Sequence, residues 1–319
     1  MKILGTGSAL PKKTVTNDDL AQVMDTSDEW IRTRTGIEER HIAVEETTTS
    51  MAVAAAKKAI EAARISVFDI DLIICATVSP DYIFPTLACE VQAAVGAERA
   101  TAFDIGAGCS GFLFALATAD AYFQTKRFHN ALIIGAETLS KMMDWSDRST
   151  CVLFGDGAGA AVVSGEGNQL LSMVQGSDGA SGMALKCDNR PVSNLYRQLG
   201  ARTYSYTQMD GSSVYKFAVR TVPMAISEAL EQAKVAADDV SLFVLHQANR
   251  RIIEAVAKRM QQPIEKFPMN LQACGNISAA SVPILLDEVM RENRVRPGEK
   301  FVLAGFGAGL TWGACVLEQ

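Results

Sequence analysis

One internal repeat constrains the fold of this 319-residue chain more than any other feature. Residues 55–76, AAKKAIEAARISVFDIDLIICA, align without a gap with residues 225–246, AISEALEQAKVAADDVSLFVLH, 170 positions later. The same spacing also relates two further pairs of segments, 101–119 with 271–289 and 131–140 with 301–310. Self-similarity at a fixed spacing indicates duplicated structural units. We therefore expect two homologous halves, residues 1–168 and 169–319.

Each half alternates helices with short strands. The segments DLIICATV (71–78), ALIIGA (131–136) and SLFVL (241–245) are continuous apolar runs, typical of strands in mixed or parallel sheets covered by helices on both faces. Helices expected over 110–119 and 277–289 are rich in small and apolar residues, as a layer between two sheets requires. We expect an α/β fold, a duplicated five-layer αβαβα arrangement, with sites where the halves meet at the carboxyl ends of strands.

The composition excludes several classes of protein. With 48% hydrophobic residues, 24 glycines and 9 prolines, the chain is neither disordered nor collagen-like. A formal net charge of −6 gives no overall attraction to nucleic acid, so an anionic partner would need a local basic patch. The seven cysteines show no CxxC or Cys/His spacing, which argues against a disulfide framework or a metal site.

Membrane insertion and secretion are not expected either. The stretches Phe267–Leu286 and Phe301–Leu317 approach the length of a membrane span, but the first contains prolines and asparagines and the second contains four glycines. The N-terminal segment MKILGTGSALPKK has too short an apolar run for a secretory signal. We expect the protein to act in the cytoplasm.

Cys109 is the strongest candidate nucleophile. In TAFDIGAGCSGF, residues 101–112, a strand is expected to end near Ile105, and Cys109 falls at the first turn of a long buried helix. Free N–H groups and the helix dipole favour a thiolate there, so we expect a lowered thiol pKa. A buried structural thiol is the alternative that position alone leaves open.

Two polar residues from the second half are expected to join this cysteine. His246 ends the strand expected over 241–245, and Asn276 lies in the turn that the repeat pairs with the Cys109 turn. Each alone also fits a structural role, as a core histidine or a turn residue. The duplication brings the two turns together, so we expect a shared pocket. The segment GFGAGL, 305–310, is expected to follow the last strand and to bring backbone N–H groups close to a substrate oxygen.

These residues resemble a known family, beta-ketoacyl-acyl-carrier-protein synthase III of the thiolase superfamily. The resemblance lies in the segments GAGCSGF, LHQANRRI, GNISAASVP and GFGAGLTWG, together with TSDEWIRTRTGIEERHI and LFGDGAGAAV. These segments extend over essentially the whole length and keep the order Cys, His, Asn. The resemblance implies a thiolase-like fold and an acyltransferase that initiates fatty-acid synthesis.

The resemblance also implies a reaction in two stages. Cys109 would attack the thioester of a primer acyl-CoA, with the N–H groups of Cys109 and Gly309 as the oxyanion hole. Malonyl-acyl carrier protein would then lose CO2, while His246 and Asn276 hydrogen-bond the thioester oxygen on which enolate charge develops. The carbanion would attack the acyl group. No cofactor and no metal are implied, because the coenzyme A thioester is a substrate.

Further binding residues follow from matching segments. Trp30, Arg34 and Arg148 match segments that clasp coenzyme A, and their chemistry suits adenine stacking and phosphate binding. A surface tryptophan with solvated arginines is the alternative. Phe84 matches a residue that lines the acyl pocket from the partner subunit, which implies a homodimer.

The helix that follows His246 is expected to be amphipathic, with a basic face left free. On an acidic protein this face is a candidate docking surface for the acidic carrier protein, and an ordinary solvated face is the alternative. The expected docking residues are Lys216, Arg250, Arg251, Lys258 and Arg259.

Three other functions stay open. A related condensing enzyme of secondary metabolism would use a different primer, and Ser212 and Tyr215 depart from the residues usual in the family near the expected pantetheine tunnel. A Cys/His/Asn hydrolase has the same residue order, although GAGCSGF is not its signature. A non-catalytic homologue would leave Cys109 unacylated.

Overall fold

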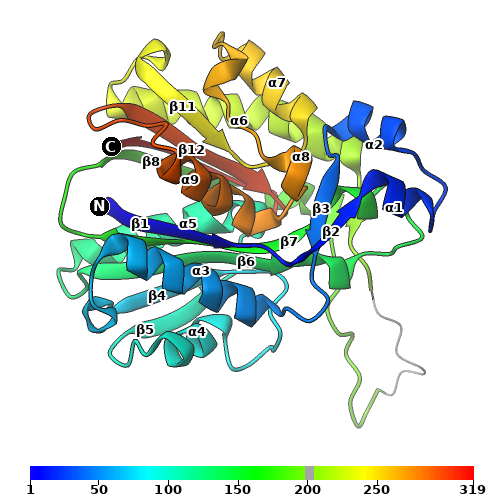
Figure 1. Cartoon of the computed structure of the whole chain (residues 1–319), viewed down its shortest axis with the longest axis horizontal. Helices are drawn as coiled ribbons and strands as arrows, with labels where there is room; N and C mark the ends of the chain where they lie inside the picture. The colour runs from blue at the N-terminus through cyan, green and yellow to red at the C-terminus, as the bar shows by residue number, and fades with distance from the viewer. Residues whose placement is uncertain (198–204) are drawn as a thin grey trace.

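Residues 1–197 and 205–319 are described by the computed structural model, and Figure 1 shows them as stacked layers of sheets and helices. The strands are β1 (Lys2–Ala9), β2 (Lys13–Thr16), β3 (Glu39–Ile42), β4 (Leu72–Ala76), β5 (Thr101–Ile105), β6 (Asn130–Thr138), β7 (Asp156–Ser164), β8 (Leu170–Ser177), β9 (Leu185–Lys186), β10 (Gln208–Met209), β11 (Val240–Leu245), β12 (Lys300–Gly307) and β13 (Thr311–Glu318). The helices are α1 (Asn17–Ala21), α2 (Asp28–Thr35), α3 (Thr48–Ala63), α4 (Leu87–Val95), α5 (Gly111–Gln124), α6 (Gly211–Ala233), α7 (Arg250–Arg259), α8 (Leu271–Cys274) and α9 (Ser281–Arg291).

Two sheets have the same strand order. The first runs β1-β7-β6-β4-β5, with β4 parallel to both β5 and β6 and the remaining pairs antiparallel. The second runs β11-β12-β13-β8, with β11 parallel to β12 and the remaining pairs antiparallel. Strands β1, β7, β6 and β4 therefore correspond to β8, β13, β12 and β11. Each sheet therefore contains both parallel and antiparallel strand pairs. The continuous apolar runs predicted mixed or parallel sheets, and the mixed type is the one observed.

Five layers follow from the way the helices cover these sheets. Helices α5 and α9 lie between the sheets, since each contacts strands of both. Helices α3 and α4 cover the outer face of the first sheet, and α6 covers the outer face of the second, with α7 packed against α6. The expected α/β fold with an αβαβα order is confirmed.

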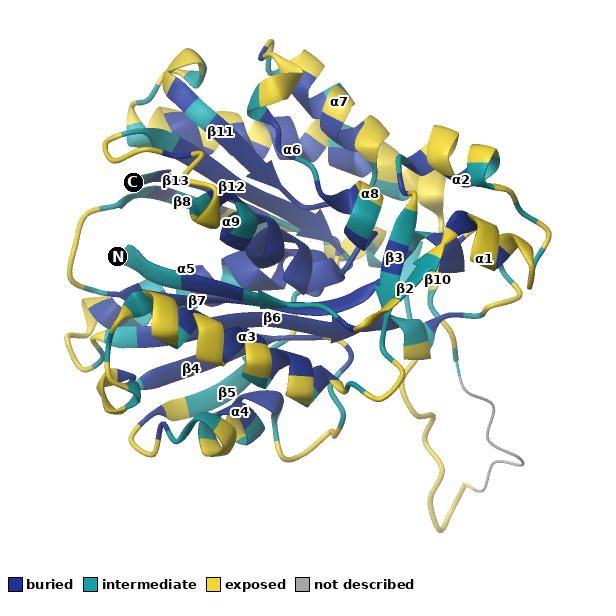
Figure 2. Ribbon diagram, viewed as in Figure 1, coloured by how far each residue is buried: buried dark blue, intermediate teal, exposed yellow. Residues whose placement is uncertain are grey.

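The middle layer holds a core shared by both sheets. Ile74 of β4 and Leu303 of β12 belong to one buried cluster with Leu113 of α5 and Val282 of α9. Figure 2 shows this layer in dark blue, with exposed residues confined mostly to the outer helices and loops. Burial of apolar side chains from both sheets in one cluster fixes how the two sheets stack.

The outer helices begin at clear capping residues. The Thr47 hydroxyl accepts a hydrogen bond from the N–H of Ser50, and the Ser50 hydroxyl accepts one from the N–H of Thr47, so α3 starts in a capping box. The Asp210 carboxylate accepts from the N–H groups of Ser212 and Ser213 and is the N-cap of α6. Local chemistry therefore sets where these helices begin.

The two halves differ at one pair of segments. Residues 101–105 form the edge strand β5, whereas the corresponding residues 271–274 form the short helix α8, where the Gln247 side chain accepts the N–H groups of Asn270 and Leu271. One local expectation from the sequence was wrong. Gly305 and Gly307 lie inside β12 instead of after the last strand, and β13 follows them. Only residues 308–310 form the connecting turn.

At two glycines, one in β6 and one in β12, a residue of the middle layer occupies the space that a side chain would need. A Cβ atom at Gly135 would lie 2.2 Å from the carbonyl oxygen of Ala279, and one at Gly305 would lie 3.2 Å from a methyl group of Leu113. Glycine in a strand often marks such a close approach. The helix layer can therefore sit against the sheets without a gap.

In the described residues, no helix is both long and apolar enough to span a membrane. All seven cysteines are free thiols.

The contact at Gly135 predicts a stability defect. Gly135→Ala should lower the melting temperature, with a loss of about 1–3 kcal/mol in the free energy of unfolding, because β6 and the turn at Ala279 must separate. Gly179→Ala is the matched control, since a Cβ atom there meets nothing within 4 Å. Thermal unfolding of the two variants checks this, and equal melting temperatures would contradict it.

Candidate active site

Cys109 lies in a single 3₁₀ turn, Gly108–Ser110, between the end of β5 and the start of α5. Its side chain is buried, with 7% of the residue exposed. Strand β12 of the other half passes directly over it: a Cβ atom at Gly307 would lie 2.7 Å from Cβ and 3.0 Å from Sγ of Cys109. Any residue larger than glycine at position 307 would displace the thiol.

A threonine ties this turn to the second half. The Thr311 hydroxyl lies 2.6 Å from the Ser110 hydroxyl and donates to the carbonyl oxygens of Ala107 and Ala308, each at 3.0 Å. Ala107 and Ser110 belong to the Cys109 turn, and Ala308 belongs to the turn between β12 and β13. The position of the thiol therefore depends on residues from both halves.

The backbone of Asn276, in the second half, is hydrogen-bonded to two residues of the first half. Its N–H donates to the carbonyl oxygen of Leu153, and its own carbonyl accepts the N–H of Gly155, at 2.9 and 3.0 Å. Its side-chain Oδ1 accepts the N–H of Ser278 at 2.9 Å. This bond orients the amide and leaves Nδ2 as its donor group.

Ser278 connects the two turns. Its hydroxyl lies close enough to Sγ of Cys109 to lower the pKa of the thiol. Ser278 occupies the position that the 170-residue repeat pairs with Gly108. Both residues have positive φ, 46° at Ser278 and 52° at Gly108. A serine in this conformation is uncommon and carries backbone strain, so its side chain is a notable feature of the site.

His246 follows β11 directly, and its N–H donates to the carbonyl oxygen of Ala304 at 2.8 Å. Its ring packs edge-on against Phe306 with 5.2 Å between ring centres. The Nδ1 atom is buried and has no hydrogen-bond partner in the part of the chain that the structure describes. Burial lowers the His246 pKa to about 3, so the imidazole is neutral at physiological pH.

The thiol pKa moves in the direction opposite to the sequence-based expectation. Burial raises the pKa of Cys109 to about 11, although hydrogen bonds from the Ser278 hydroxyl and from the N–H groups of Cys109 and Ala308 favour the thiolate. The negative charge of Glu137 raises it further. Desolvation outweighs the helix N-terminus, because the thiol sits before α5 in a closed layer and not at an open helix end.

Two neighbouring backbone N–H groups of the turn between β12 and β13 are candidates for the second donor. The N–H of Ala308 lies close enough to Sγ to lower the pKa of Cys109, and the N–H of Gly309, which the sequence suggested as the oxyanion-hole donor, stays a prediction. Gly309 is exposed, and its carbonyl oxygen faces Gly182. Residues 308–310 form the turn between β12 and β13, with Gly307 still inside β12.

Trp30, Arg34 and Arg148 form one cluster on the surface. The guanidinium carbons of Arg34 and Arg148 lie 4.7 and 5.1 Å from the centre of the Trp30 ring. Arg148 also pairs with the carboxylate of Asp25 at 3.2 Å. Both guanidinium groups lie over one indole ring, so the structure brings the three residues together as the sequence predicted.

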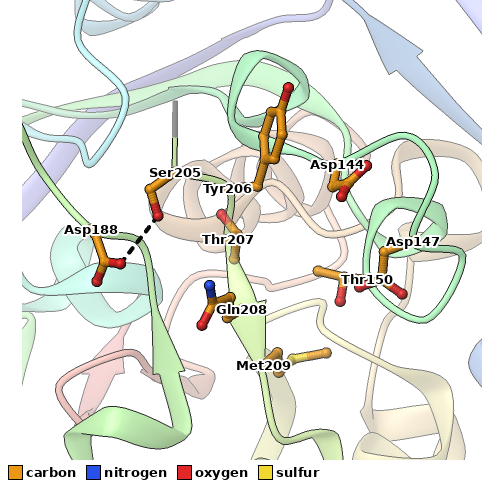
Figure 3. A pocket seen from close by; sticks show the side chains of 9 residues that line it. All are labelled: Asp144, Asp147, Thr150, Asp188, Ser205, Tyr206, Thr207, Gln208 and Met209. Carbon is orange, nitrogen blue, oxygen red and sulfur yellow. Dashed lines mark hydrogen bonds between the residues drawn. The ribbon is translucent and has the colours of Figure 1, made fainter. Parts of the chain in front are cut away.

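An open hollow of about 560 Å³ lies beside the loop that carries Arg148 (Figure 3). Figure 3 shows Asp144, Asp147 and Thr150 on one side and the segment 205–209 on the other. Met209, in the segment expected near the pantetheine tunnel, is part of its lining.

The expected docking residues all lie exposed at the start of α6 and along α7, which pack side by side. Three of them already have partners: Arg250 pairs with Glu254, Arg251 donates to the Thr33 carbonyl, and Arg259 donates to the Val219 carbonyl. Lys216 and Lys258 are the freer of the five. Phe84, expected at a partner subunit, is 83% exposed in the loop before α4.

Sequence reasoning missed Glu137 and Ser278. Glu137 is fully buried near the end of β6, and the Ser278 hydroxyl lies close enough to lower the pKa of both Glu137 and Cys109. The signal was available, because a carboxylate directly after the apolar run ALIIGA is unusual and the repeat pairs Glu137 with Gly307, the residue over the thiol. In the described residues, no group of three or more His, Cys, Asp or Glu side chains is placed to hold a metal ion.

Comparisons with known proteins agree with this geometry. Family models described as 3-oxoacyl-[acyl-carrier-protein] synthase III and its C-terminal part match residues 103–179 and 230–319. Beta-ketoacyl-[acyl-carrier-protein] synthase III of Clostridium acetobutylicum is 44% identical over 100% of this chain and 98% of its own length. The enzyme of the same name from Porphyra purpurea is 47% identical over 99% and 98%. The crystal structure of 3-oxoacyl-[acyl-carrier-protein] synthase III from Aquifex aeolicus has a TM-score of 0.93 and 46% identity, covering 100% of this chain and 99% of that one.

Because the imidazole of His246 is buried, we predict that its protonation state does not change between pH 5 and pH 8. The ring signals of His246 should not shift between pH 5 and pH 8, because its pKa near 3 lies below this window. Nuclear magnetic resonance of the histidine rings checks this, with His246→Gln to assign the signal. A titration midpoint for His246 between pH 5 and pH 8 would contradict the closed, desolvated position.

Proposed function

The chain belongs to the beta-ketoacyl-[acyl-carrier-protein] synthase III family, and we propose that Cys109, His246 and Asn276 carry out its reaction. The protein catalyses the decarboxylative condensation of a primer acyl-CoA with malonyl-acyl carrier protein, the initiating step of fatty-acid synthesis. The products are β-ketoacyl-acyl carrier protein, coenzyme A and CO2. The observation that carries the assignment of roles is the buried thiol of Cys109 enclosed by β12 and Ser278.

In the first stage Cys109 attacks the carbonyl carbon of the acyl-CoA thioester. The exchange of one thioester for another is nearly balanced in free energy, so the protein has to stabilise the tetrahedral intermediate. The N–H groups of Cys109 and Ala308 both reach the sulfur and are the donors for the oxyanion. Coenzyme A leaves, and the acyl group stays on Sγ.

In the second stage malonyl-acyl carrier protein loses CO2 and its enolate attacks the acyl group. His246 and Asn276 donate hydrogen bonds to the thioester oxygen of the malonyl group, where the negative charge develops. A neutral imidazole suits this role, because it donates an N–H without first having to lose or gain a proton. The Asn276 amide is already oriented by its bond to Ser278.

The surface cluster around Trp30 marks where the coenzyme A thioester enters the site. Trp30, Arg34 and Arg148 bind the adenine and phosphates of coenzyme A, supported by the stacked guanidinium groups. The scheme uses no further cofactor, and the cytoplasm is the compartment it assumes. The exposed side chain of Phe84 lines the acyl pocket of a second subunit, so the working form is a homodimer. Primer chain length depends on that shared pocket.

The two stages predict different defects for the three residues. Cys109→Ala should form no acyl adduct with acetyl-CoA, because it lacks the sulfur that accepts the acyl group. His246→Ala and Asn276→Ala should still form it, but should lose roughly 10²- to 10³-fold in malonyl decarboxylation. Intact-protein mass spectrometry measures the adduct and CO2 release measures the second stage. Normal condensation by Cys109→Ala would defeat the assignment.

The basic face of α7 docks the acidic carrier protein, and Lys258 offers the cleanest test because Arg251 also holds α2. Lys258→Glu should raise the KM for malonyl-acyl carrier protein about 10-fold, since charge repulsion replaces attraction, and leave the KM for acyl-CoA unchanged. Lys57→Glu, on the outer helix α3, is the control. An unchanged KM for the carrier protein in the Lys258 variant would refute the docking surface.

A further inference from the structure

Glu137 is a buried carboxyl group that the reaction scheme above does not use. It lies near the carboxyl end of β6 with 0% of the residue exposed. Its carboxylate accepts hydrogen bonds from the Ser79 hydroxyl at 2.5 Å, from the Val78 N–H at 3.1 Å and from the Thr77 hydroxyl at 3.3 Å. No cationic side chain within residues 1–197 and 205–319 forms an ion pair with it. A carboxyl group kept in such a position calls for a functional explanation.

Ser278 links this carboxyl group to the nucleophile. The turn that holds Ser278 packs against both the Cys109 turn and β6. The Ser278 hydroxyl lies close enough to the Glu137 carboxyl group and to Sγ of Cys109 to lower the pKa of each. Its backbone is held in the strained conformation described above, and the Ser278 N–H is fixed by Asn276. The three side chains therefore form a continuous path from sulfur to carboxylate inside the protein.

The path supplies a proton acceptor for the Cys109 thiol, which the reaction needs. The thiol must lose its proton to attack, yet the pKa of Cys109 is raised to about 11. His246 is a poor proton acceptor, since burial holds its pKa near 3. Burial raises the pKa of Glu137 to about 7, which leaves a large fraction ionised at neutral pH and close to the best value for a base.

We propose that Glu137 accepts the thiol proton of Cys109 through the hydroxyl of Ser278 during acyl transfer. The Sγ proton moves to Ser278 Oγ while the Ser278 hydroxyl proton moves to the Glu137 carboxylate. The thiolate attacks the thioester carbon, and the C–S bond to coenzyme A breaks with its electron pair on the leaving sulfur. That sulfur takes up one proton as Glu137 returns its own through Ser278, so the acyl-enzyme forms with Glu137 ionised again.

The charge balance of the site is consistent with this transfer. Cys109 and Glu137 repel each other when both are ionised, so one negative charge shared between them is favoured. The other titratable groups on elements packed around β6 are occupied or distant: Cys75 on β4 is a buried thiol, Asp156 on β7 accepts hydrogen bonds from Ser140 and Ala43, and Asp81 pairs with Lys141. α3 presents Thr48 to this end of β6, and the ionisable residues of α5 and α9 lie towards their far ends.

The experiment measures the rate at which acetyl-CoA acylates Cys109 in a single turnover, followed by rapid quench and intact-protein mass spectrometry between pH 5.5 and pH 10. In the wild-type protein the rate should rise through a midpoint near pH 7, as Glu137 ionises, and then level off. In Glu137→Gln this midpoint should disappear, with a rate at pH 8 lower by about 10²- to 10³-fold that rises only with hydroxide concentration.

Companion variants separate proton transfer from structure. Ser278→Gly removes the hydroxyl, suits the positive φ and matches its repeat partner Gly108, so it should lose the same midpoint. Glu137→Asp keeps a carboxylate and should retain a midpoint at a reduced rate. Asp287→Asn, another buried carboxylate with hydroxyl partners but no link to Cys109, is the control for fold stability and should keep the wild-type profile.

Two results would overturn the proposal. A Glu137→Gln profile with the wild-type midpoint would show that Glu137 only supports the fold. Faster acylation by Glu137→Gln would show that its charge merely hinders the thiolate. The proposal rests on the nucleophilic role of Cys109, and failure of that role is distinguishable: the wild-type protein would then form no acyl adduct at any pH.

Discussion

The contact of Gly307 with Cys109 is the constraint on which the rest of the structure depends. The strand of one half can lie against the nucleophile of the other only because residue 307 has no side chain, and the Cβ atom of any other residue would lie 3.0 Å from Sγ. The repeat places Glu137 at the equivalent position of the first half, against the turn that holds Ser278. One duplicated geometry therefore encloses the thiol on one side and provides a carboxyl group on the other.

Much of the fold was predictable because similar segments recur in the sequence at a constant spacing of 170 residues. The alternation of helices with apolar strands, such as those of Ile74 and Leu303, predicted the order of the layers. The predicted strand ends placed His246 directly after one strand and Cys109 in the turn after another. The full-length match to synthase III relatives removes the hydrolase alternative.

The remaining features depend on tertiary contacts that periodicity does not encode. Helix α8 replaces a strand because Gln247 reaches two backbone N–H groups 23 and 24 residues further along the chain. The direction of the Cys109 pKa shift depends on how completely the layers exclude water, and the choice between Ala308 and Gly309 depends on where β12 ends. Each of these is set by packing between segments distant in sequence.

The crystal structure of the protein acetylated by acetyl-CoA is the most direct test of the claim that both halves build one site around the Cys109 sulfur. We expect the acetyl oxygen about 2.7–3.1 Å from the N–H groups of Cys109 and Ala308, with His246 and Asn276 lining the same cavity. An acetyl oxygen turned away from both N–H groups, or an acetyl group in a space that His246 and Asn276 do not reach, would contradict the account.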